Sequence, residues 1–295
     1  MKRALILAVC CGITGACGQT VLDVGTTRPP PYRFGTPRLL TELDTSYSNQ
    51  NPTLTADLLE LFFTSSRNSD SADVWTARRT SANDTFAAPT LVSEVSTSAF
   101  ETSPAVTLDG LSLYFGSDRD GGEGEVDIWI ATRPDRNTAW AGIQNVSSLN
   151  STSKDIPRPP GQHNLVMPMA SQRDSSTGYE TYLAARPAVD QAFGTPVIVT
   201  GLADADVAIA DGFLTDDGLL LFYSATPPNV APDLYVAQRA TTAEPFSLPL
   251  ALTDLNTSAD ERDPWLSPDG TSFYFSSDRS GSLQIYEVSA TRLSP

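Results

Sequence analysis

Acidic side chains occur where the copies of a repeated pattern in this chain differ from one another, and they are the residues best suited to chemistry. The five carboxylates are Glu101, Asp155, Asp211, Glu261 and Asp263. Two carboxylates held close together can act as the acid and the base or nucleophile of glycoside cleavage. Clustered carboxylate oxygens can also bind Ca²⁺. The sequence therefore makes these five residues candidates for a binding site, with Glu101, Glu261 and Asp263 as the candidate catalytic set.

Other common catalytic chemistries have little support. His163 is the only histidine, and no nucleophile motif lies near it, so a Ser-His-Asp or Cys-His unit is not expected. All three cysteines (Cys10, Cys11 and Cys17) lie at the N-terminus, which excludes thiol chemistry from the rest of the chain. No EF-hand-type spacing is present. We expect no cofactor, with Ca²⁺ bridging the carboxylate-bearing loops as the alternative.

A second set of charged residues recurs in nearly every copy of the pattern and is expected to stabilise the fold. It comprises the acids Asp73, Asp127, Glu180 and Asp233 and the arginines Arg67, Arg119, Arg173 and Arg279. A side chain present in each copy of a repeat usually serves the repeat itself, here as a partner for a turn amide or a nearby arginine. Function is expected where the copies differ, which is the position of the five candidate carboxylates.

The elements that must position these carboxylates repeat with a period of about 53 residues. One aromatic residue opens each copy (Phe34, Phe86, Trp140, Phe193, Phe246), a second follows (Trp75, Trp129, Tyr182, Tyr235, Tyr286), and an arginine closes it (Arg79, Arg133, Arg186, Arg239, Arg292). Three independent markers with one period indicate repeated copies of a single structural unit.

Each copy reads as four short strands, which in the first copy lie near 39–41, 52–55, 58–64 and 74–77. Asp-Gly turns separate the second and third strands at Asp109-Gly110, Asp217-Gly218 and Asp269-Gly270. The third strands, such as 219–223, are almost continuously apolar, which is typical of burial on both faces. Four-stranded sheets packed around an axis are propeller blades. We therefore predict an all-β fold, a five-bladed β-propeller of four-stranded blades.

The phase of the repeat predicts how the ring closes. The repeats start with a first-strand segment near Leu39 and end with a fourth-strand segment near Tyr286. Pairing of these N- and C-terminal strands would complete the last blade and remove two exposed sheet edges.

Residues 1–17 have the features of a targeting leader. Lys2-Arg3 precedes an apolar run over 4–9, and small residues precede Cys17. This arrangement resembles a bacterial lipobox, in which the cysteine is lipidated, with Thr14 where lipoboxes prefer Leu. A cleaved signal peptide is the alternative. We expect export, lipidation at Cys17 and a location in the periplasm or at the outer membrane, with a Pro-rich linker over 18–33 and the propeller over 34–295.

The last copy carries the most complete motif. It runs Asp263-Pro264-Trp265-Leu266-Ser267-Pro268-Asp269-Gly270, then Ser277-Asp278-Arg279-Ser280-Gly281 and Ile285-Tyr286. This pattern resembles the TolB-type, WD-like propeller repeat. The resemblance implies the propeller fold and says little about function, because one fold hosts many functions. It does not extend to the role of TolB in the Tol system.

The net charge of −16 limits the partners. It argues against nucleic acid and against adsorption to anionic lipid, so membrane contact is expected only through a lipid anchor. Strand direction places most carboxylates on the face that carries the five candidates, here called the upper face.

Two functions stay open. One is a non-catalytic module of the bacterial cell envelope, monomeric, that binds a protein or glycan through the acidic upper face. The other is an envelope glycan hydrolase or lyase with carboxylates at the channel mouth, as in five-bladed glycosidases. We favour the first.

Overall fold

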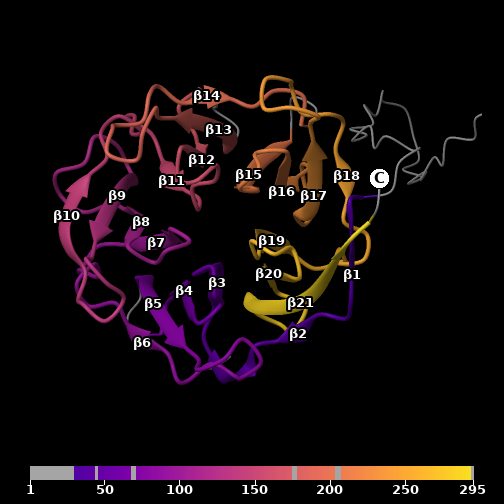
Figure 1. Cartoon of the computed structure of the whole chain (residues 1–295), viewed down its shortest axis with the longest axis horizontal. Helices are drawn as coiled ribbons and strands as arrows, with labels where there is room; N and C mark the ends of the chain where they lie inside the picture. Colours follow the sequence, from indigo (N-terminus) through magenta and orange to yellow (C-terminus); the bar gives the residue numbers. More distant parts are fainter. Residues whose placement is uncertain (1–29, 44–45, 68–70, 175–177, 203–206, 294–295) are drawn as a thin grey trace, which may run out of the picture.

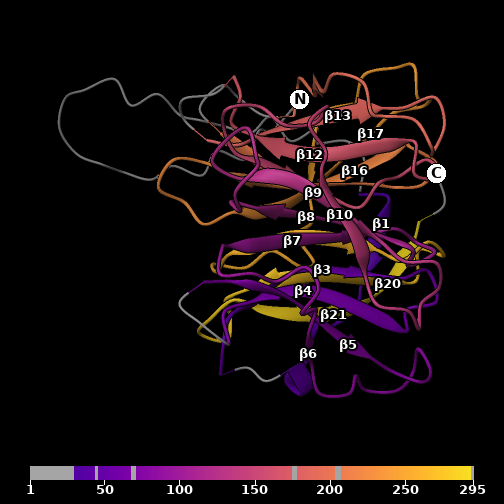
Figure 2. The same cartoon turned by 90° about the vertical axis from the view of Figure 1, so that its left-hand side faces the viewer.

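The computed structural model describes residues 30–43, 46–67, 71–174, 178–202 and 207–293. Within these ranges five antiparallel β-sheets surround a central axis (Figure 1), and the only helix is a single 3-10 turn, η1 (Thr41–Leu43). Figure 2 shows the same ring from the side, with the strands running roughly along its axis. The predicted five-bladed propeller is confirmed.

Each blade runs from an innermost strand at the axis to an outermost strand at the rim. Blade 1 consists of β3 (Asn49–Leu54), β4 (Glu60–Ser65), β5 (Asp73–Arg78) and β6 (Thr90–Leu91), and blade 2 of β7 (Glu101–Val106), β8 (Ser112–Ser117), β9 (Asp127–Thr132) and β10 (Ala141–Asn145). Blade 3 consists of β11 (Asp155–Pro157), β12 (Val166–Ser171), β13 (Glu180–Ala185) and β14 (Val197–Ile198), and blade 4 of β15 (Ala208–Leu214), β16 (Leu220–Thr226), β17 (Asp233–Gln238) and β18 (Leu250–Ala251).

Blade 5 is built from both ends of the described chain. Its inner strands are β19 (Glu261–Leu266), β20 (Ser272–Ser277) and β21 (Gln284–Arg292), and its rim is supplied by β2 (Arg38–Leu39) and β1 (Tyr32–Phe34). Leu39 pairs with Tyr286 in the register of β2 and β21, as the phase of the repeat predicts. An ion pair of 2.7 Å between Arg38 Nη2 and Glu287 Oε2 lies beside this pairing.

Two of the three repeat markers contact each other. The closing arginine of one copy lies over the opening aromatic ring of the next, at 4.3 Å for Arg79 and Phe86 and 4.1 Å for Arg133 and Trp140. The Nε of Arg79 also donates to the carbonyl of Leu58 in the turn of its own blade. Cation–π contact and hydrogen bonding therefore explain why these two positions keep a fixed spacing.

Apolar packing between blades fills the ring. Phe273 of β20 is fully buried, and its ring centroid lies 5.4 Å from that of Phe222 in blade 4 and 4.9 Å from that of Phe34 in β1. The second strand of each blade, counted from the axis, is the third strand of the sequence repeat. It lies at the centre of its sheet and is buried on both faces, as its apolar run predicts. The N-terminal strand thus joins the same core that it closes.

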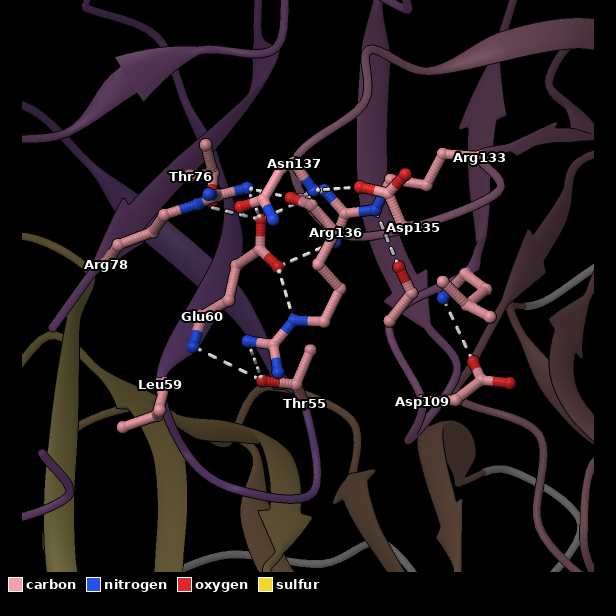
Figure 3. A network of polar contacts seen from close by, with 12 residues as sticks. Thr55, Leu59, Glu60, Thr76, Arg78, Asp109, Arg133, Asp135, Arg136 and Asn137 are labelled. Atoms are coloured by element: carbon pink, nitrogen blue, oxygen red, sulfur yellow. Dashed lines mark hydrogen bonds and ion pairs between the residues drawn. The ribbon is translucent and has the colours of Figure 1, made fainter. Parts of the chain in front are cut away.

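A charged network closes the seam between blades 1 and 2 at the lower face (Figure 3). Glu60 is buried, and its carboxylate lies 2.6 Å from Arg133 Nη2 and 2.6 Å from Arg78 Nη2. Arg136 approaches the same carboxylate at 3.4 Å through its Nε. One buried carboxylate is therefore held by three guanidinium groups, one of which, Arg133, is itself buried.

Candidate functional site

Four of the five innermost strands carry the same irregularity, which decides what faces the channel. The register shifts after the second residue of β3, β7 and β19 and after the third residue of β15. The next residue has a left-handed backbone, with φ of 57° at Asn51, 49° at Ser103, 62° at Asp211 and 57° at Asp263. A β-bulge re-aims the side chain at the bulged position, and these four side chains line the upper end of the channel.

Blade 3 lacks this bulge and places an arginine in the channel instead. Its innermost strand, β11, pairs regularly and ends at Pro157. Arg158 follows, where blades 1, 2 and 5 have proline and blade 4 has glycine. The side chain of Arg158 is 8% exposed, and its Nη2 lies 3.0 Å from Asp263 Oδ1 and also pairs with Asp211. One guanidinium nitrogen therefore holds both channel carboxylates.

The two channel carboxylates have further partners. Asp263 accepts hydrogen bonds from the backbone N–H of Asn51 at 3.1 Å and from its side-chain amide at 2.6 Å. Asp211 accepts a hydrogen bond of 2.6 Å from the Ser224 hydroxyl. Burial lowers the pKa of the Arg158 guanidinium, and the charge of Asp263 opposes this shift. Asp263 therefore offsets part of the cost of burying the Arg158 cation.

Above this cluster the channel widens into a cavity of about 510 Å³, here called the mouth cavity. This volume suits a small ligand or one end of a larger one. Residues of all five blades line it, including Gln50, Thr102, Tyr179, Asp211 and Arg262. A separate cavity of about 280 Å³ lies at the lower end of the channel, lined by Pro159 and Pro160 among others.

The structure brings together two of the five carboxylates that the sequence singled out. Asp211 and Asp263 line the mouth cavity, whereas Glu101, Asp155 and Glu261 do not. These three are fully buried inside their blades. The proposed catalytic set of Glu101, Glu261 and Asp263 is therefore not gathered in one cavity, and a binding role remains a prediction for Asp211 and Asp263.

The three buried carboxylates serve their own blades. Glu261 accepts hydrogen bonds from the Thr257 N–H at 2.7 Å and the Ser277 hydroxyl at 2.8 Å, and it pairs with Arg279 at 2.9 Å. Glu101 has equivalent contacts, and Arg173 pairs with Asp155 at 2.6 Å. Each arginine of this type also donates to a loop carbonyl, such as Leu255 for Arg279. The structural role predicted for the recurring arginines is confirmed.

Sequence reasoning missed Arg158 and Tyr179 as lining residues. Arg158 carried a signal, because it replaces the proline or glycine that follows the bulged residue in every other copy. Cys17 lies outside the described residues. Among the residues that are described, no group of three or more His, Cys, Asp or Glu side chains is arranged to hold a metal ion. No helix within the described ranges is both long enough and apolar enough to span a bilayer.

No protein-family model and no curated protein matches the chain. Solved structures of similar fold include TolB from Acinetobacter baumannii (TM-score 0.52, 12% identity), where the match covers 83% of this chain and 55% of TolB. The GH62 α-L-arabinofuranosidase catalytic domain of Coprinopsis cinerea has a TM-score of 0.61 at 12% identity. This match covers 90% of this chain and 98% of that domain. The endo-arabinase of Bacteroides thetaiotaomicron has a TM-score of 0.59 at 12% identity. This match covers 89% of this chain and 98% of the endo-arabinase. At these identities the likeness shows the fold alone.

Proposed function

We propose that this chain is a non-catalytic binding module of the bacterial cell envelope, which holds its ligand in the mouth cavity. The observation that carries this proposal is the pairing of Arg158 with both Asp211 and Asp263. A glycoside hydrolase needs one carboxyl group free to donate a proton and another free to attack or to activate water. Both channel carboxylates are instead held by one buried cation, which favours binding over catalysis.

An envelope glycan hydrolase or lyase is the second candidate. It is favoured by the position of Asp211 and Asp263 in an open cavity and by the similar fold of the arabinofuranosidase and endo-arabinase. The two candidates are separated by incubating the purified chain with chromogenic α-L-arabinofuranosides, β-xylosides and arabinan. We expect no hydrolysis above that of buffer, and turnover that disappears in an Asp211→Asn variant would establish the enzyme instead.

Binding at the mouth cavity is tested by capture from solubilised envelope fractions. The double variant Gln50→Ala, Arg262→Ala alters two lining residues that are partly exposed, so the ring should stay folded. We expect it to lose the ligand that the wild-type chain captures. Asp190→Asn, an exposed change on the lower face, serves as the control. Retention of the ligand by the double variant together with its loss in the control would place the site elsewhere.

The proposal includes export and a lipid on Cys17, which rest on the leader sequence. Mass spectrometry of the mature N-terminus tests this part. We expect a diacylated or triacylated Cys17 as the first residue and its absence in a Cys17→Ser variant. An unmodified N-terminus beyond residue 17, or a retained Met1, would contradict lipidation without affecting the mouth cavity.

A further inference from the structure

The charged groups around the mouth cavity neutralise one another. The four acids (Asp118, Glu125, Asp211, Asp263) and three bases (Lys154, Arg158, Arg262) that line it are nearly balanced, although the whole chain carries −16. Arg158 pairs with two of the acids, Lys154 lies 3.4 Å from Glu125, and Arg262 pairs with Asp260. Every base that lines the cavity is thus already paired, so an anionic ligand would lose its water here without finding a free counter-ion, which is unfavourable.

The walls of the cavity differ in chemistry. On one side Val126, Ile156 and Ala170 form a small apolar cluster, and Tyr179 packs against it. On the other side Asn51, Asp211 and Asp263 present amide and carboxylate groups. A ligand that fits both walls has an apolar face and several hydrogen-bonding groups on its edge.

Two arginines that line the cavity carry buried hydrogen-bond donors that have no acceptor. The Nε of Arg158 and the Nε of Arg262 are buried and lack a hydrogen-bond partner within the described part of the chain. A buried donor left without a partner costs free energy, more so on a charged group. Both side chains line the mouth cavity, so oxygen atoms of a ligand, with a small shift of either side chain, could supply the missing acceptors.

The polar wall is fixed before any ligand arrives. Asn51 and Asp263 occupy bulges with left-handed backbones and are joined by two hydrogen bonds, and prolines follow both residues. Side chains held in this way lose little further entropy when a ligand binds, which favours binding of small groups with few contacts.

We infer that the mouth cavity takes an uncharged, hydroxyl-rich group, namely the terminal sugar of a neutral glycan. The inference rests on the proposed function. A sugar ring has an apolar face for the wall at Tyr179 and hydroxyl groups for the opposite wall. Its oxygens can accept from Arg158 and Arg262, and its hydroxyls can donate to Asp211. An acidic segment of a protein partner would find no free base here and would fit less well.

The test uses the full mature chain on an array of oligosaccharides with neutral pentose or hexose ends and the same chains ending in a uronic acid. We expect binding to neutral ends and weaker binding to the acidic ones. Tyr179→Ala should weaken affinity for the best neutral ligand at least about tenfold, as loss of an aromatic contact does. Tyr179→Phe keeps the ring and should stay within about threefold. Asp190→Asn should match the wild type, and thermal unfolding checks that each variant is folded.

Three outcomes would overturn the inference: no neutral oligosaccharide binds, acidic ends are preferred, or Tyr179→Ala binds as well as the wild type. Failure of the proposed function gives different results. Cleavage of a bound neutral glycan would refute the non-catalytic role while leaving the ligand class intact. Binding of an envelope protein at the mouth, without competition from any neutral sugar, is a fourth outcome against the sugar, and it would leave the proposed binding role intact.

Discussion

Asn51 and Asp263 are separated by 212 residues in the chain, yet the side-chain amide of Asn51 lies 2.6 Å from the carboxylate of Asp263. This contact joins the innermost strands of blade 1 and blade 5, so it bridges the interface between the first blade and the last. Asp263 also pairs with Arg158 of blade 3. One buried carboxylate therefore connects three blades at the channel.

We expect Asn51→Ala to destabilise the fold by about 1–3 kcal/mol, because Asp263 loses a donor in a buried position. Alanine would also be strained at the left-handed backbone of residue 51. Asn51→Gly removes the same amide without that strain and separates the two effects. Urea unfolding measures both. Equal stability of Asn51→Gly and the wild type would show that the amide contributes nothing.

Glu60→Ala is expected to cost about 3–5 kcal/mol, since it leaves the buried guanidinium of Arg133 without its carboxylate. The side chain of Arg133 is 2% exposed, against 51% for Arg78 in the same network. Arg78→Ala should therefore change stability by less than about 1 kcal/mol. The double variant Glu60→Ala, Arg133→Met should be more stable than Glu60→Ala alone. If it is less stable, desolvation of Arg133 is not the cause.

Removal of residues 30–40 should destabilise the whole ring, because β1 and β2 complete blade 5 and Phe34 packs in the core. The expected result is one cooperative urea transition at a much lower midpoint, or no folded protein. Val197→Ala, on the exposed outermost strand of blade 3, is the control and should leave the midpoint unchanged. A second, separate transition with blades 1–4 intact would show that β1 and β2 stabilise only blade 5.

We expect the contribution of Asp233 to the stability of the fold to decrease as the pH rises. Burial, with the charge of Glu261, raises the pKa of Asp233 from 3.8 to about 6 in the folded protein. The folded state then binds more protons than the unfolded state between these values, so this residue's contribution to stability falls as pH rises from about 4 to 6. Asp233→Asn should be more stable than the wild type at pH 7, by about 1 kcal/mol after solvent screening, and the gain should vanish below pH 4.

Asp135→Asn is the matched comparison for this pH effect. Hydrogen bonds from Thr138 and the Asn137 N–H lower the pKa of the exposed Asp135 carboxyl. Its contribution is present above its unfolded pKa and is lost as pH falls, so Asp135→Asn should not stabilise the fold at pH 7. A gain at pH 7 in both variants would point to net charge instead of the burial of Asp233.

The ring was predictable from the sequence because its markers depend on contacts between successive copies of the repeat and on the pairing of its two ends. Arg133 over Trp140 and Leu39 opposite Tyr286 are consequences of the period and its phase. The site was only partly predictable. Residues two apart in a regular strand share a face, which would place Glu261 beside Asp263. The bulge after Arg262 breaks this alternation, so Glu261 turns into its blade and Asp263 into the channel.

Arg158, Pro159 and Pro160 affect how a ligand would bind and dissociate. The guanidinium and its two carboxylates line the mouth cavity, and the lower cavity, lined by Pro159 and Pro160 among others, shares no lining residue with it. We therefore expect that a polymer does not thread through the ring from one cavity to the other. Arrival and departure then share a single opening, so two ligands exclude each other and an occupied site must empty before it can exchange.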